Sequence, residues 1–250
     1  MGMCLMTSHG RNHSFTLIEL LVVITILMIL AALLLPALGR ARAKAKSTLC
    51  VAQNKEIAHG FTLYSSDFDG YLPAYKSDTS WPPKKVFYTN ALHKAGAILV
   101  DKWNNENWGM TSSGIWLCPG VNDPTYYQQG GTEVYAGGGY GVETSHVIRI
   151  AKYHRMSDFT RPNEVWLIGD TWTNGANTAA HDPDHMYTNY AFLCGVTGSY
   201  HPDWLHIPYP AQPAPRHLER VNNAFIDGHV ETNKWSFFYD NPNVFAHNGL

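Results

Sequence analysis

The feature that most constrains this chain is an apolar run close to its N-terminus. The run extends from Phe15 to Leu35 and has 21 residues. Its only polar side chains are those of Thr16, Glu19 and Thr25. An α-helix rises 1.5 Å per residue, so the run would be about 31 Å long, which matches the hydrocarbon core of a bilayer. The run therefore predicts a membrane-spanning helix.

A cleaved secretory signal is the main alternative, because Arg11 precedes the apolar run as in the basic region of such signals. The run is longer than the apolar region of a usual signal, however, and Ala31 and Ala32 are followed by further leucines. A buried helix of a soluble domain would not normally lie at the very N-terminus. We therefore favour a membrane helix.

Glu19 is a carboxylate inside this predicted helix. An ionisable side chain in a membrane helix is unfavourable, and it is usually paired and functional. The apolar run contains no Lys or Arg. The cation that pairs with Glu19 must therefore come from the chain's own N-terminus or from another molecule.

The segment from residue 15 to residue 38, "FTLIELLVVITILMILAALLLPAL", closely resembles the N-terminal signature of type IV prepilins and type II secretion pseudopilins. The resemblance implies that a membrane peptidase cuts before Phe15 on the cytoplasmic side and methylates the new amino group. It also implies that Glu19 meets the N-terminal amine of a neighbouring subunit, and that Pro36 kinks the helix. The chain has Ser14 where the family usually has glycine.

The charges around the span conflict with this resemblance. Four bases lie between Arg40 and Lys46, against Arg11 and the amino terminus before the span. The positive-inside rule alone would place the C-terminal body in the cytoplasm. The resemblance implies the opposite, because the leader must face a cytoplasmic peptidase. We therefore expect a single-pass protein of the inner membrane with an extracytoplasmic, periplasmic body, and a basic collar that meets anionic headgroups.

Helix-favouring sequence continues beyond the apolar run. Cys50, Ile57, Phe61 and Tyr64 follow at intervals of seven, four and three residues, which places them on one stripe of a helix. We expect this stripe to pack on a β-sheet.

The segment "SSDFDGYLP", residues 65–73, is predicted to end the helix in a turn. Its Asp67-x-Asp69-Gly70 pattern also resembles the opening of a calcium loop, but no acidic residue supplies the later ligands of an EF-hand. The turn is the preferred interpretation, and a calcium site is the alternative. No other cofactor is expected.

The rest of the chain predicts a β-containing body. Only 15% of residues are charged, whereas there are 8 Trp, 14 Tyr, 21 Gly and 14 Pro, which suits short strands and ordered loops. "RPNEVWLIGDTW", residues 161–172, predicts a central strand. Val221–Ile226 and His229–Trp235 predict a hairpin around Asp227-Gly228, because both turn positions accept positive φ.

Three further segments are less regular. A short helix is expected within residues 81–108. "GIWLCPG", residues 114–120, predicts a strand that runs into a Pro-Gly turn. "GGTEVYAGGGYG", residues 130–141, predicts a loop, and its glycines lack the spacing of a nucleotide site.

His217, nine intervening residues and Asp227-Gly228 match the H-x9-DG region near the C-terminus of many pseudopilin-like proteins. His217, Asp227 and His229, with "HDPDH" at 181–185, could also form a metal or acid/base site. We favour a structural role, because Asp227 serves the turn and His217 can hydrogen-bond loop backbone. No catalytic residue and no metal ligand is therefore predicted.

The four cysteines, Cys4, Cys50, Cys118 and Cys194, have none of the spacings typical of zinc sites. We therefore expect no structural zinc. Removal of the leader would remove Cys4, and outside the cytoplasm one disulfide could form. Cys50 with Cys118 is the preferred pair, and burial of both as small apolar side chains is the alternative.

These observations predict an α+β, pilin-like fold. A long N-terminal helix, membrane-spanning in its first half, would pack on a small antiparallel β-sheet with long loops. The chain would divide into a leader (1–14), the methylation motif and membrane helix (15–38), the helix beyond the membrane (39–66) and a globular head with the H-x9-DG hairpin (67–250).

We interpret the chain as a structural subunit, not an enzyme, of a type II secretion or type IV pilus filament. The resemblance implies other pilin or pseudopilin subunits, the prepilin peptidase, an inner-membrane assembly platform and membrane lipid as partners. The net charge of −2 does not indicate binding to nucleic acid, which is itself negatively charged. The alternative is a membrane-tethered envelope module that binds or hydrolyses glycans through Trp- and Tyr-rich loops, although no Ser-His-Asp order or carboxylate pair stands out.

Overall fold

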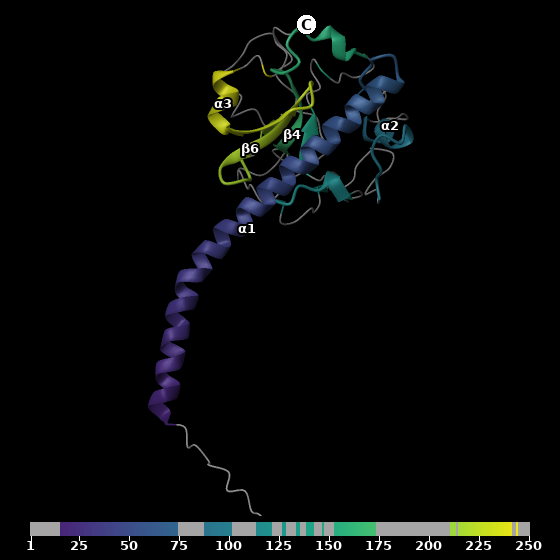
Figure 1. Ribbon diagram of the computed structural model, residues 1–250. Helices are drawn as coiled ribbons and strands as arrows, with labels where there is room; N and C mark the ends of the chain where they lie inside the picture. Colours follow the sequence, from purple (N-terminus) through teal and green to yellow (C-terminus); the bar gives the residue numbers. More distant parts are fainter. Residues whose placement is uncertain are drawn as a thin grey trace, which may run out of the picture. The chain divides into compact units, whose positions relative to one another are not determined.

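The structure is a computed structural model. It describes residues 16–74, 88–101, 114–121, 127–128, 134–135, 139–142, 147, 153–173, 211–213, 215–241 and 244. The chain divides into two compact units, Met1–Arg42 and Ala43–Leu250. Helix α1, Leu17–Asp67, runs from the first unit into the second (Figure 1).

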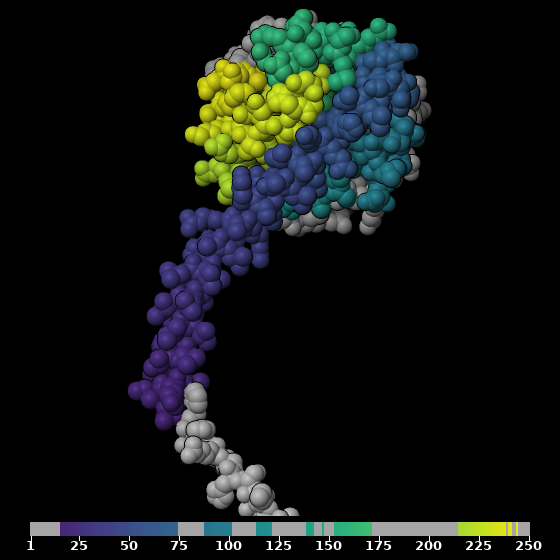
Figure 2. Space-filling model, viewed as in Figure 1, coloured from purple at the N-terminus to yellow at the C-terminus, as the bar shows by residue number. Residues whose placement is uncertain are grey.

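The part of α1 in the first unit exposes its apolar side chains. From Leu17 to Leu38 the large apolar side chains are between 42% and 88% exposed, and Figure 2 shows this segment in purple. The Thr25 hydroxyl donates to the Val22 carbonyl at 2.7 Å, so this polar group is satisfied within the helix. Among the described residues, α1 is the one helix that is long and apolar enough to cross a membrane.

The second unit contains an antiparallel sheet in the order β3-β4-β6-β7, with β5 paired to β4 and a separate pair β1-β2. The strands are β1 Tyr127–Gln128, β2 Val134–Tyr135, β3 Tyr140–Val142, β4 Trp166–Thr173, β5 Ala211–Pro213, β6 Arg220–Phe225 and β7 Val230–Lys234. Because β4 lies between β3 and β6, the predicted central strand is confirmed. The long helix and the antiparallel sheet together make an α+β, pilin-like arrangement.

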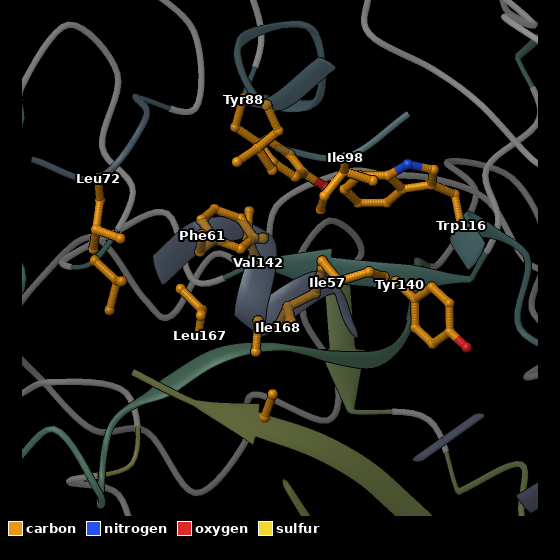
Figure 3. Close-up of a cluster of buried hydrophobic side chains, with 14 of the residues drawn as sticks. Ile57, Phe61, Leu72, Tyr88, Ile98, Trp116, Tyr140, Val142, Leu167 and Ile168 are labelled. Atoms are coloured by element: carbon orange, nitrogen blue, oxygen red, sulfur yellow. The ribbon is translucent and has the colours of Figure 1, made fainter. Parts of the chain in front are cut away.

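The predicted stripe on α1 packs against this sheet. Cys50, Ile57 and Phe61 are fully buried, and the half-buried Tyr64 packs on the same core. Figure 3 shows Ile57 and Phe61 above Ile168 of β4. The prediction of a sheet-facing stripe is therefore confirmed.

Aromatic rings cover α1 from the side away from the sheet (Figure 3). Tyr88 opens α2, Tyr88–Lys94, which is the short helix predicted in this region, and Trp116 ends η2, Gly114–Trp116. The Tyr88 ring stacks on Phe61 at a centroid distance of 5.9 Å and meets Trp116 edge-on at 6.2 Å. Buried aromatic pairs add to the stabilisation from apolar burial. The second half of α1 is thus the centre of the body's core.

Strand β4 is buried on both faces. Ile168 belongs to the core around α1, whereas Trp166 packs with Phe225 and with Phe238 of α3, Trp235–Asp240. The Trp166 and Phe238 rings meet edge-on at 5.2 Å. A strand with two buried faces has a continuous apolar sequence, which explains the run "VWLI" in this segment.

Strands β6 and β7 form the predicted hairpin, but the predicted two-residue turn is wrong. The Gly228 N–H donates to the Phe225 carbonyl at 2.9 Å, and the Phe225 N–H donates to the His229 carbonyl at 3.0 Å. Within the turn, φ is positive at Gly228 (+87°) but not at Asp227. This is a three-residue loop with glycine in the left-handed position. Asp227 contributes instead by accepting a hydrogen bond from the His229 N–H at 3.1 Å.

Two further local predictions are corrected. "GIWLCPG" begins as the 3-10 helix η2 and not as a strand, although the Val121 N–H···O=C Cys118 bond of 3.0 Å confirms the Pro-Gly turn. "GGTEVYAGGGYG" contains β2 and the start of β3. Pairing with β4 outweighs the local preference of a glycine-rich sequence, because β3 is buried along its length.

Helix α1 ends in the predicted turn. The Gly70 N–H donates to the Ser65 carbonyl at 2.8 Å, and Asp69 and Gly70 both have positive φ. Such a left-handed ending satisfies carbonyls of the last helical turn. The alternative of calcium binding at Asp67 and Asp69 stays a prediction.

Gly169 of β4 lies where β6 approaches most closely. A Cβ atom on Gly169 would lie 2.7 Å from the Asn222 carbonyl oxygen and 2.8 Å from Asn223 Cα. Both atoms belong to the backbone and cannot move aside cheaply. The close pairing of β4 with β6 therefore requires glycine at this position.

We predict that Gly169→Ala lowers the free energy of unfolding by about 3 kcal/mol, because the two central strands must separate. Gly228→Ala is the comparison, since nothing lies within 4 Å of the added Cβ. It should cost only about 1 kcal/mol, for its left-handed backbone. Denaturant unfolding of the detergent-solubilised chain measures both, and equal losses would contradict the prediction.

Candidate functional site

The N-terminus of α1 is closed by a capping box. The Glu19 carboxylate oxygen Oε2 accepts hydrogen bonds from the Thr16 N–H and hydroxyl, each at 2.8 Å. In return, the Thr16 hydroxyl accepts a bond from the Glu19 N–H at 3.3 Å. This reciprocal pattern satisfies donors that have no partner within the helix. This role of Glu19 was not predicted from the sequence, although Thr-x-x-Glu is the signature of the cap.

The cap leaves one oxygen of Glu19 for a second partner. Among the described residues only Thr16 hydrogen-bonds to this exposed carboxylate, and it does so through Oε2. Ser14 and Phe15, the predicted cleavage and methylation positions, lie outside the described residues. The contact between Glu19 and the amine of another subunit stays a prediction.

A comparison with protein families identifies the type of this N-terminal segment. Residues 10–35 match the model of the prokaryotic N-terminal methylation motif. The chain has a prepilin-type N-terminus. The match contains Ser14, Phe15 and Glu19, and it does not extend to the H-x9-DG region. No curated protein and no solved structure matches the chain.

The two ends of the H-x9-DG segment lie apart in the structure. His217 is buried in the turn before β6, where its Nε2 lies 3.2 Å from Cys118 Sγ. Asp227 lies in the turn after β6, where its Oδ1 is 2.5 Å from Nδ1 of His229. The pair therefore does not form one site. The His217 imidazole contacts the side chains of Cys118 and Asp170, and its expected hydrogen bond to loop backbone stays a prediction. The "HDPDH" segment, 181–185, lies outside the described residues.

His217 belongs to a buried polar cluster that links four segments of the body. The cluster consists of Cys50 in α1, Cys118 after η2, Asp170 in β4 and His217, each at most 2% exposed. Cys50 Sγ lies 3.2 Å from Asp170 Oδ1, and His217 Nε2 lies 3.7 Å from Asp170 Oδ2. One ligand atom from each of the four lies within 4.8 Å of the others.

The two cysteines predicted as a pair are neighbours in this cluster. Their sulfurs are 4.0 Å apart, about twice the length of a disulfide bond, and both are free thiols in the structure. Both are also fully buried, as the alternative of two small apolar side chains requires. The disulfide itself stays a prediction.

Donors surround the carboxylate of Asp170. The Asn222 N–H donates to Oδ2 at 2.9 Å, and Arg216 Nη1 lies 3.7 Å from Oδ1. The buried Arg216 side chain also donates to the carbonyls of Gly139, at 2.7 Å, and Thr171. The cation beside Asp170 is therefore fixed in place by backbone carbonyls of β4 and of the residue directly before β3.

Burial and neighbouring charges shift the pKa values in the cluster. Burial raises the pKa of the Asp170 carboxyl, against the opposing effects of His217 and Arg216. Burial alone would lower the pKa of His217, but its interactions with Asp170 and Cys118 outweigh this and raise the pKa to about 9. Burial also disfavours the Cys118 thiolate, yet Cys50 and His217 bring that pKa well below its usual value. Burial raises the pKa of Cys50. These directions favour a Cys118 thiolate beside a His217 imidazolium.

The sequence predicts Cys50 with Cys118 as a pair and singles out His217, but it does not join these residues to Asp170. Asp170 follows the apolar run of β4, and because β4 continues to Thr173 its carboxylate lies inside a buried strand. A carboxylate within an apolar central strand must find partners. That rule was the one available signal for the cluster.

We predict that Arg216→Gln destabilises the body by about 3–5 kcal/mol, because it removes the cation beside a buried carboxylate. Arg220→Gln is the matched control. Arg220 is exposed and donates to the Thr232 carbonyl at 3.4 Å, so its loss should cost less than about 0.5 kcal/mol. Denaturant midpoints compare the two, and similar losses would count against the assigned role of Arg216.

Proposed function

We propose that this chain is a pseudopilin-like structural subunit of a membrane-associated filament in type II secretion or type IV pilus assembly. The observation that carries the proposal is the N-terminal methylation motif at residues 10–35. The same segment forms an exposed apolar helix, and the body behind it has a pilin-like arrangement of helix and antiparallel sheet. The protein then acts by assembly and catalyses no reaction.

Processing supplies the cation that Glu19 lacks. Cleavage between Ser14 and Phe15 creates a new amino group directly before the cap of α1. In the filament, that amine of one subunit pairs with Glu19 of another, where apolar surroundings make an unpaired carboxylate unfavourable. The partners are therefore other subunits, the prepilin peptidase and the inner-membrane assembly platform.

The head lies outside the cytoplasm, and α1 crosses the inner membrane once. The exposed bases Arg40, Arg42 and Lys44 follow the apolar segment and meet anionic headgroups. No comparison supports the alternative of a glycan-binding or glycan-hydrolysing module.

Cleavage before Phe15 predicts a mature chain that begins with N-methylated phenylalanine. Intact-mass and N-terminal peptide measurements on the membrane fraction check this. Ser14→Gly is the control variant, and it should yield the same N-terminus at equal or higher efficiency. A mature N-terminus at any other residue would contradict the proposed processing.

Glu19→Ala is predicted to abolish incorporation into filaments while the head stays folded, because the assembly contact lies outside the head. Thr16→Ala separates assembly from capping, since it removes the hydroxyl of the cap and keeps the carboxylate. It should assemble at near wild-type level. Filament fractionation and near-UV circular dichroism give the two readouts, and normal assembly of Glu19→Ala would refute the contact.

A further inference from the structure

The buried cluster of Cys50, Cys118, Asp170 and His217 offers a complete set of zinc ligands. Two sulfurs, one imidazole nitrogen and one carboxylate oxygen are the atom types that hold Zn²⁺ in proteins. They come from α1, the turn after η2, β4 and the turn before β6. The filament function proposed above makes no use of them.

The distances between these atoms fit a tetrahedral zinc site. Zn–S bonds are about 2.3 Å long, and Zn–N and Zn–O bonds are about 2.0–2.1 Å long. In a tetrahedron with these bonds, two sulfurs lie about 3.8 Å apart, a sulfur and a nitrogen or oxygen about 3.6 Å apart, and a nitrogen and an oxygen about 3.4 Å apart. The structure has 4.0 Å between the two sulfurs, 3.2 Å from Cys118 Sγ to His217 Nε2 and 3.2 Å from Cys50 Sγ to Asp170 Oδ1. The other carboxylate oxygen, Oδ2, lies 3.7 Å from His217 Nε2, and one ligand atom from each of the four residues lies within 4.8 Å of the others.

The groups around the cluster suit a metal with two thiolate ligands. The Gly120 N–H lies 3.4 Å from Cys118 Sγ and the Asn54 side-chain amide 3.5 Å from Cys50 Sγ, so each sulfur faces an N–H donor. Two thiolates and the Asp170 carboxylate carry three negative charges, which Zn²⁺ and the adjacent Arg216 balance. A buried site without net charge avoids the cost of an unpaired ion.

A catalytic Cys-His-Asp triad would use the same residue types in a different geometry. In a triad, one nitrogen of the imidazole faces the nucleophile and the other faces the carboxylate. Here the same atom, His217 Nε2, lies 3.2 Å from Cys118 Sγ and 3.7 Å from Asp170 Oδ2. Both thiols are also fully buried. The Cys118 sulfur and the Asp170 oxygen thus both lie near the same nitrogen. This is the arrangement expected for ligands that surround one metal ion.

We propose that Cys50, Cys118, Asp170 and His217 bind one Zn²⁺ ion, which fixes the second half of α1 to the sheet. Because the ligands come from four separate segments, zinc binding is coupled to folding of the body. This proposal is independent of the proposed filament function.

The test uses the full chain, purified in detergent under reducing conditions without chelator. Elemental analysis should find about one zinc per chain. Removal of the metal should lower the melting temperature by about 5–10 °C, and added Zn²⁺ should restore it. Exchange with Co²⁺ should give the strong visible absorption and thiolate charge-transfer bands of a tetrahedral site.

Variants assign the ligands. Cys118→Ser and Asp170→Asn should reduce the zinc content to below about 0.2 per chain. His229→Ala is the matched control, because this histidine lies in the exposed hairpin turn, and it should keep full zinc content. If the ligand variants do not fold, the Co²⁺ spectrum of the wild-type chain still decides.

Two results would overturn the proposal. One is a Cys50–Cys118 disulfide in chains whose thiols are trapped by alkylation directly after cell lysis. The other is a reduced full-length chain that contains no zinc, takes up neither Zn²⁺ nor Co²⁺, and melts at the same temperature with and without them.

Discussion

The rest of the structure depends on one helix, α1, whose two halves need different surroundings. The first half needs an apolar medium, and the second half needs the core of the body. The first half of α1 exposes apolar side chains on all sides, an arrangement that is stable in a bilayer or against other apolar helices. The second half buries Ile57 and Phe61 between the sheet and the rings of Tyr88 and Trp116. Because both halves depend on surroundings outside the helix, packing and not helix propensity maintains its length.

Glu19 connects this helix to the proposed assembly. Its capping of Thr16 places a negative charge in the first turn, where the helix dipole favours it. The same carboxylate has a second oxygen that is available for the proposed contact with the amine of another subunit. A residue that looks out of place in an apolar run thus has a local role within the chain and a proposed role between chains.

Much of the fold could be predicted from periodicity and turn residues. The stripe at Cys50, Ile57 and Phe61, the central strand around Ile168 and the hairpin around Gly228 each have a local signature, and the structure contains all three. The predicted loop geometry at Asp227 was wrong, because the N–H groups of Ile226 and Asp227 donate to the carbonyls of Val165 and Pro162 in another segment. The predicted strand at the start of "GIWLCPG" was wrong, because a local bond from the Leu117 N–H to the Gly114 carbonyl closes a 3-10 turn there.

The polar cluster could not be predicted in this way. Cys50 and Asp170 are 120 residues apart in sequence, and Cys118 and His217 are 99 apart. Residues this far apart in sequence have no characteristic spacing, so the lack of a zinc-type motif does not exclude a shared site. Only the fold brings them together, and in doing so it ties α1 to β4.

The proposed contact between Glu19 of one subunit and the processed N-terminus of another can be tested by zero-length carbodiimide crosslinking. Membranes from cells expressing isotopically light and heavy chains together would be treated and analysed by mass spectrometry. We expect an amide between Glu19 and the Phe15 amine that joins light and heavy peptides. Linkage confined to peptides of one isotopic composition, or no linkage at Glu19, would contradict it.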